Sequence, residues 1–291
     1  MSSKQSKCAA IAVCLTASSI ICMFSVSVAV AQTQPRVAVV DFTGDERGEV
    51  TALVRMLVQS FNVIDADQTR AAVRGASYDG NLNFSREEAR ALGMSIGCDF
   101  YILGTTHIVR RIVSAEKFSH DGLSGLFIVE TRSGRLVKFS FEQVQAATET
   151  EARAKLAALL KQDWAGCAAA ITEARSKSLA EAEITPRASD EVIEIFDAEK
   201  TPPGMTPPVF SQRLKPDYTA EAELMGVTAT VEIAAVFGAD GRVGEVEVVR
   251  WAGFGLDEVA VATVKQLRFK PAERVGKAVT IRALVRYNFH R

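Results

Sequence analysis

An alternating stretch near the end of the chain constrains the fold most narrowly. The segment "VEIAAVFGADGRVGEVEVV" (231–249) places apolar residues at every second position on both sides of a glycine-containing turn. This period of two is that of a β-strand with one buried face, and Asp240-Gly241 suits a tight hairpin turn. Gly244 interrupts the alternation on the returning strand, which predicts a β-bulge. The sequence therefore predicts an antiparallel hairpin with one buried face.

The residues after this hairpin complete a layer. Apolar residues at helical spacing follow "WAGFG", and Asp257 and Glu258 are placed to complement the dipole at the start of that helix. The closing segment 279–289 alternates again, with Arg282 and Arg286 opposite its apolar face. We therefore expect residues 208–291 to form an antiparallel sheet with a helix packed across it.

The closing strand is the predicted partner-binding edge. A terminal strand exposes unpaired N–H and C=O groups, which an incoming extended peptide can satisfy by β-augmentation. The alternative is that Arg282 and Arg286 only protect this edge against aggregation. The predicted binding residues are Val279, Thr280, Ile281, Arg282, Leu284, Arg286 and Asn288.

The C-terminal region resembles the TonB C-terminal domain family from about Pro208 to Arg291. The matching residues occur in the family's order along the chain. They are Pro216, Tyr218, Ala222, Gly226-Val227, Asp240-Gly241-Arg242-Val243, Gly255-Leu256-Asp257, Phe269-Lys270-Pro271-Ala272, Gly276-Lys277 and Tyr287-Asn288-Phe289. The resemblance implies a domain that binds an extended segment of an outer-membrane TonB-dependent transporter and is driven by an ExbB–ExbD-like inner-membrane motor. It leaves open both a monomer and a homodimer.

The region 36–171 alternates strands and helices, which predicts an α/β sandwich. "RVAVVDF" (36–42), "NVID" (62–65) and "CDFYILGTTHIV" (98–109) are expected strands, and 125–141 is an expected hairpin turning at Ser133-Gly134. Ser85 and Glu88 form a capping box for a helix that ends near Gly97. A long helix is expected from about Thr148. The whole chain is thus predicted to be α+β.

The N-terminal region also resembles the exported α/β domains of the TolB, CsgG and LpoB families. The segments "VAVVDF", "FNVIDADQ" and "EARALGMSIGCDFYILG" carry this resemblance. It implies an interaction domain in envelope assembly or docking and transfers no specific site. Between the two regions, residues 172–207 are acidic and contain Pro202-Pro203 and Pro207. We expect a linker there, with the continuation of the preceding helix into its first part left open.

The first residues predict export. Lys4 and Lys7 precede an uncharged apolar run, residues 8–31, that ends in Ala29-Val30-Ala31 before Gln32. That ending suits a signal-peptidase site, whereas the length of the run also suits a membrane anchor, and both outcomes remain open. Either outcome puts the folded part in the periplasm, anchored in the inner membrane if residues 1–31 are retained. Without an anchor, the alternative function is a soluble periplasmic envelope-assembly adaptor that is not coupled to a motor.

Two cysteines lie outside this leader. Export permits a disulfide between Cys98 and Cys167. Cys167, however, falls on an apolar helical stripe, where a free cysteine is commonly buried as a small apolar residue.

Charge and motifs argue against other classes of function. Lys plus Arg (34) nearly balance Asp plus Glu (35), so the chain offers no electrostatic signature of nucleic-acid binding. His107, His120 and His290 are too scattered in the sequence to suggest a metal motif, and nucleophile-elbow, P-loop and dinucleotide motifs are absent. We therefore expect neither an enzyme nor a cofactor.

Overall fold

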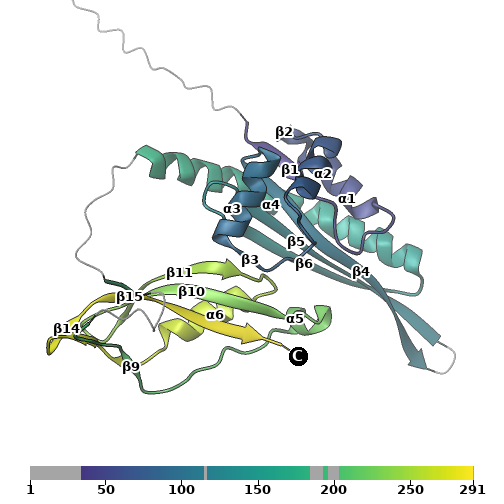
Figure 1. Ribbon diagram of the computed structural model, residues 1–291. Coiled ribbons are helices and arrows are strands. Elements are labelled where there is room, and N and C mark those ends of the chain that lie inside the picture. Colours follow the sequence, from purple (N-terminus) through teal and green to yellow (C-terminus); the bar gives the residue numbers. More distant parts are fainter. Residues whose placement is uncertain (1–33, 115–116, 184–192, 196–202, 291) are drawn as a thin grey trace, which may run out of the picture. The chain divides into compact units, whose positions relative to one another are not determined.

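The structure is a computed structural model that describes residues 34–114, 117–183, 193–195 and 203–290. The predicted leader, residues 1–31, lies outside these ranges. Within them, no helix is both long and apolar enough to cross a membrane. The described chain is an α+β protein, as predicted, with two five-stranded sheets (Figure 1).

The first sheet is mixed and has the strand order β2-β1-β4-β5-β6. Strand β1 (Arg36–Val39) is parallel to β2 (Asn62–Val63) on one side and to β4 (Phe100–Ser114) on the other. Strand β5 (Lys117–Glu130) pairs antiparallel with both β4 and β6 (Leu136–Ala146). The strands predicted from "RVAVVDF", "NVID" and "CDFYILGTTHIV" are all present, and so is the predicted hairpin.

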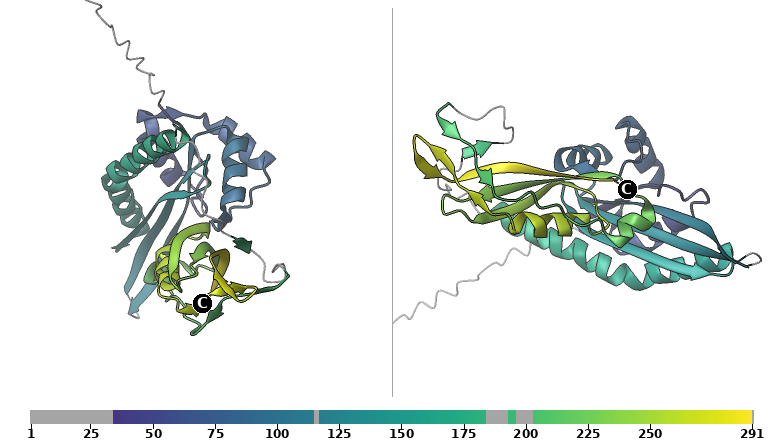
Figure 2. Two further views of the ribbon diagram at one scale, coloured as in Figure 1. Left: turned by 90° about the vertical axis from the view of Figure 1, so that its left-hand side faces the viewer. Right: turned by 90° about the horizontal axis from the view of Figure 1, so that it is seen from below.

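Helices cover both faces of this sheet, as expected of an α/β sandwich (Figure 2). Apolar residues of α1 (Glu49–Leu57) and α4 (Glu149–Glu183) are buried against one face, and those of α2 (Ala66–Gly75) and α3 (Arg86–Ile96) pack against the other. A 3₁₀ turn (Val58–Ser60) follows α1. The capping box of α3 and its left-handed C-cap glycine are present as predicted, whereas α2 was not foreseen.

The second sheet has the order β3-β11-β10-β15-β7. Its centre is the predicted hairpin, β10 (Ala229–Phe237) and β11 (Val243–Trp251), and a register shift between Ala235 and Phe237 confirms a bulge near Gly244. Helix α6 (Leu256–Lys265) packs on this layer, and α5 (Ala220–Met225) precedes it in the chain. The other strands of this sheet are β15 (Ile281–Phe289), β3 (Phe84–Ser85) and β7 (Ile193–Ile195). Two smaller sheets are separate from it. One pairs β9 (Val209–Phe210) with β12 (Phe269–Lys270), and the other contains β8 (Met205–Thr206), β13 (Ala272–Arg274) and β14 (Lys277–Val279).

The segment predicted as a linker, 172–207, contains regular structure. Helix α4 runs to Glu183, so the preceding helix does continue into the first part of this segment. Strand β7, within the same segment, pairs with β15. The acidic and proline residues that suggested a linker therefore do not exclude secondary structure in this part of the chain.

The two layers share one aromatic cluster. Phe127 of the first sheet lies 5.8 Å from the ring of Trp251 and 5.5 Å from that of Phe254, measured between ring centroids. Phe139 lies 4.9 Å from Phe254, and Phe84 lies 5.3 Å from Trp251. Such aromatic pairs stabilise a contact beyond the effect of the buried area alone. The C-terminal layer is therefore packed against the N-terminal layer through a continuous apolar core.

The structure corrects the hypothesis of a disulfide. Cys98 and Cys167 are both buried free cysteines, and they belong to separate core clusters on opposite faces of the first sheet. Burial raises the pKa of Cys98 to about 11 and that of Cys167 to about 12. Because a thiolate is the reactive form, both thiols are poorly reactive in the folded protein.

Candidate docking edge

The predicted edge strand is divided into two strands in the structure. Val279 is the last residue of β14 and pairs with Ala272, so it does not belong to the edge. Thr280 lies between the strands, and its hydroxyl accepts a hydrogen bond from the Ala239 N–H at 3.2 Å. The other predicted residues lie on β15.

The predicted alternation along β15 is confirmed. Ile281 and Phe289 are buried, and Ala283, Val285 and Tyr287 pack on the same core. The opposite face carries the predicted polar and basic residues. There Asn288 accepts a hydrogen bond from the hydroxyl of Thr230 at 2.9 Å, which joins β15 to β10 on that face.

One side of β15 is fully paired and the other is only partly paired. Strand β10 pairs antiparallel with all nine residues of β15. On the outer side, β7 pairs in parallel with Ile281, Arg282 and Ala283. On this outer side, the remaining stretch, Leu284–Phe289, has no strand partner in the part of the chain that the structure describes.

The backbone direction identifies which groups this stretch leaves free. The N–H of Ile193 donates to the carbonyl of Thr280 at 3.4 Å, so that carbonyl points to the outer side. The backbone N–H and C=O groups of successive residues point to alternate sides of a strand. Those of Leu284, Arg286 and Asn288 therefore point to the same outer side as the Thr280 carbonyl. These are three of the residues predicted as binding residues.

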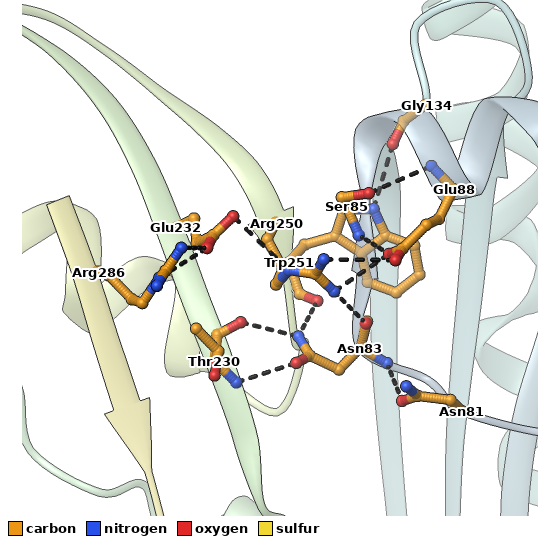
Figure 3. Close-up of polar contacts among 10 residues, drawn as sticks. All are labelled: Asn81, Asn83, Ser85, Glu88, Gly134, Thr230, Glu232, Arg250, Trp251 and Arg286. Atoms are coloured by element: carbon orange, nitrogen blue, oxygen red, sulfur yellow. Dashed lines mark hydrogen bonds and ion pairs between the residues drawn. The ribbon is translucent and has the colours of Figure 1, made fainter. Parts of the chain in front are cut away.

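Both predicted arginines take part in chains of ion pairs that reach the N-terminal layer. Arg286 lies 2.6 Å from Glu232, Glu232 lies 3.6 Å from Arg250, and Arg250 lies 3.1 Å from Glu88 of α3 (Figure 3). The side chain of Arg286 is 60% exposed. An ion pair that is exposed on the arginine side contributes little to stability.

The second chain of ion pairs is more buried. Arg282 lies 2.6 Å from Glu247, which also pairs with Arg135 at 3.0 Å and with Arg86. Burial acts to raise the pKa of Glu247, but the hydrogen bonds and positive charge of Arg135 and Arg86 outweigh it, and the pKa is lowered. Glu247 is therefore ionised at neutral pH and anchors Arg282.

The opposite end of the sheet is joined to the N-terminal layer by side chains. The amide of Asn83 donates to the carbonyls of Thr230 (2.8 Å) and Trp251 (2.7 Å), and its oxygen accepts from the Thr230 N–H (2.9 Å; Figure 3). Strand β3 pairs Phe84 with Trp251, and the Trp251 indole donates to the Gly134 carbonyl at 3.1 Å. The two-residue strand β3 is too short to show a period in the sequence, so this junction was missed. The aromatic residues of "WAGFG" were the available signal, because such side chains seldom lie in an exposed turn.

The structure shows no candidate metal centre in its described ranges. No group of three or more His, Cys, Asp or Glu residues there could hold a metal ion. His107 and His120 have separate partners: the imidazole of His107 lies 3.0 Å from the Thr105 hydroxyl, and that of His120 lies 3.2 Å from the Ala147 carbonyl.

Comparisons with known proteins bear on both regions. Solved structures that are similar to this chain include a lipoprotein from Neisseria meningitidis (11% identity, TM-score 0.33, 44% of this chain and 96% of that chain). The LpoB C-terminal domain from Salmonella enterica is also similar (12% identity, TM-score 0.28, 39% of this chain and 84% of that chain). So is the TonB C-terminal domain from Pseudomonas aeruginosa (18% identity, TM-score 0.27, 35% of this chain and 96% of that chain). No curated protein matches the chain. Residues 215–290 match the family model of the Gram-negative bacterial TonB protein C-terminal, which confirms the resemblance of this C-terminal region to that family.

Proposed function

We propose that the chain is a periplasmic protein-binding protein that docks an extended segment of an outer-membrane transporter along the open part of β15. The single observation that carries this proposal is the outer side of Leu284–Phe289, which has no strand partner among the described residues and lies in a region that matches the TonB C-terminal family. That family consists of protein-interaction domains of Gram-negative bacteria rather than enzymes.

The size and chemistry of the open stretch suit a short peptide. Six residues at about 3.3 Å each span roughly 20 Å, enough for a strand of typical length. A strand added there would bond to the free groups of Leu284, Arg286 and Asn288, and its side chains would alternate between the two faces of the sheet. The exposed guanidinium of Arg286 would favour an acidic or polar residue of the peptide beside it.

Strand β7 supports the same proposal from within the chain. It is an extended segment of sequence Ile-Glu-Ile that already adds to the first three residues of β15. Its pairing supports the proposal, because β7 already occupies the outer side of β15 over Ile281–Ala283. A docked peptide would therefore continue a ladder that β7 begins.

A second candidate is a soluble adaptor that uses the same edge without an inner-membrane motor. The aromatic cluster that joins the two layers favours it, because the docking sheet is packed on an N-terminal domain. Coupling to an ExbB–ExbD-like motor requires that residues 1–31 be retained as an anchor. The mass of the exported protein distinguishes the two candidates, since loss of residues 1–31 would exclude direct transduction.

The docking proposal is tested with two substitutions at one position. Arg286→Pro removes the outward N–H donor, whereas Arg286→Ala removes the guanidinium and keeps the donor. We expect a transporter peptide to slow amide exchange across Leu284–Phe289 in the wild type. Binding should be lost in the proline variant and weakened only a few-fold in the alanine variant. Unchanged exchange at saturating peptide would exclude docking at this edge.

A further inference from the structure

A second unpaired strand edge lies in the N-terminal domain, on the distal half of β4. Pairing of β4 with β1 covers Phe100–Ile102, and the last backbone bond on that side runs from the Thr106 N–H to the Thr43 carbonyl at 2.9 Å. From His107 to Ser114, β4 has only β5 as a partner in the described chain. Figure 1 shows this end of the hairpin projecting away from the helices. We call His107–Ser114 the distal edge.

The distal edge has free hydrogen-bonding groups in a known direction. The carbonyls of Ile102 and Gly104 accept bonds on the β1 side, and the N–H of Thr106 donates there. Because orientation alternates along the strand, the N–H and C=O groups of Ile108, Arg110 and Ile112 point to the open side. An added strand would satisfy them.

The side chains of this hairpin end are unusually apolar for a surface. Ile112 is 76% exposed, Val113 57%, Val109 44% and Phe118, on β5, 37%. Contiguous exposed apolar residues commonly mark an interaction surface. A partner strand would cover part of this surface on both faces of the hairpin.

The charges of the distal edge select the partner. Arg111 forms an ion pair with the buried carboxylate of Asp121 on β5, at 2.5 Å. Arg110 stacks over the ring of Phe118 at 3.5 Å and has no carboxylate partner within the described residues. Neighbouring residues of a strand point to opposite faces, so within the described residues Arg110 leaves an unpaired positive charge on one face of the hairpin, whereas Arg111 on the other face is paired with Asp121.

A second copy of the chain is a poor occupant. Antiparallel pairing of two distal edges would bring the Arg110-Arg111 pair of one chain against that of the other, and like charges across a ladder are destabilising. At the edge of β15, by contrast, the strand that this chain itself adds places Glu194 in register with Arg282. We propose that the distal edge binds an acidic, extended segment of a partner protein, which adds as a strand beside His107–Ser114.

The test uses a synthetic peptide of alternating valine and glutamate, with the matched valine–lysine peptide as its control. In the full exported chain, the acidic peptide should slow amide exchange of Ile108, Arg110 and Ile112, and added salt should weaken its binding. Arg110→Glu should weaken binding at least about fivefold, since it replaces attraction by repulsion. The same charge reversal at Arg90, an exposed arginine of α3 that forms no ion pair within the described residues, should leave binding unchanged.

The measurement is made in the Arg286→Pro background, so that binding at β15 does not contribute and the two proposals fail separately. Equal binding of the acidic and basic peptides would overturn the proposal, and so would a lack of protection at saturating acidic peptide. Two further results would also overturn it. One is binding to anionic phosphatidylglycerol vesicles without any binding of the peptide, which would assign the surface to lipid. The other is a dimer in light scattering that Arg110→Glu abolishes, which would assign it to a second copy.

Discussion

The two ends of the C-terminal sheet are covered by the chain in different ways. At the β11 end, Asn83 and Trp251 form side-chain hydrogen bonds across the junction, and aromatic rings pack around them. At the β15 end, β7 covers only Ile281–Ala283, and the rest of that edge is unpaired in the described residues. The sheet is therefore fixed at one end and accessible at the other.

If the docking proposal holds, this difference would allow the sheet to add a strand at β15 while its β11 end keeps a defined position. Side-chain contacts with the N-terminal layer hold the β11 end, so under the docking proposal an incoming strand would add to an edge that is already in place. An edge that is held in a binding conformation loses less entropy when it binds. The following predictions test whether contacts at the β11 end contribute most to the stability of the sheet and whether the β15 end is open to a partner.

The largest effect is expected for Trp251→Ala. The indole is 2% exposed, packs on Phe84 and Phe127, and donates to the Gly134 carbonyl. Removing a buried tryptophan costs about 3–5 kcal/mol of unfolding free energy, which urea unfolding measures. The control is Trp164→Ala, at a partly buried position of α4. An equal or smaller loss in Trp251→Ala would contradict the importance of the β11 end.

Asn83→Ala should have the next largest effect. The side chain makes three hydrogen bonds to the backbone of β10 and β11, and its removal leaves part-buried carbonyl and N–H groups unpaired. Unpaired buried groups cost about 1–3 kcal/mol. Asn62→Ala, at an exposed position of β2, should change the unfolding free energy by no more than about 0.5 kcal/mol. If the two variants unfold alike, Asn83 does not hold the sheet.

Asp257 should make the β11 end sensitive to pH. Burial raises its pKa to about 7, although the N–H groups of Ala252 and Gly253 bond to its oxygens and act in the opposite direction. Between the ordinary value of about 4 and about 7, the folded state binds a proton that the unfolded state has lost. The unfolding free energy therefore falls as the pH rises through this window, by at most about 1.4 kcal/mol per pH unit, and levels off above it.

The measurement compares wild type and Asp257→Asn by urea unfolding between pH 4 and pH 8. The wild type should lose stability relative to the variant as the pH rises, because the variant has no carboxyl group at this position. Parallel pH profiles would show that Asp257 is ionised in both states and does not titrate in that window.

The sequence predicted the long strands of the C-terminal sheet but not the contacts that cover its two ends. The alternation of β10, β11 and β15 has a period of two, and local burial on one face is enough to produce it. The contacts of Asn83 and the pairing of β7 depend on residues far apart in the chain, and two- or three-residue strands have no detectable period. The division at Thr280 was missed because Val279 and Ile281 continue one alternating pattern although they belong to different sheets. The edge itself was predictable, whereas its partial cover was not.

The smallest effect on stability, and the sharpest test of accessibility, is expected for Ile193→Pro. Proline removes the N–H that donates to the Thr280 carbonyl at 3.4 Å, which is a long and weak bond. We expect the unfolding free energy to change by no more than about 0.5 kcal/mol, because β7 pairs over three residues only. Release of β7 should at the same time lengthen the open edge and tighten the binding of a transporter peptide about two- to fivefold. The control Ile193→Val keeps the donor and should leave the affinity as it is. A loss of stability as large as that of Asn83→Ala would mean that both ends of the sheet are held firmly, and the comparison between them would no longer explain where a partner binds.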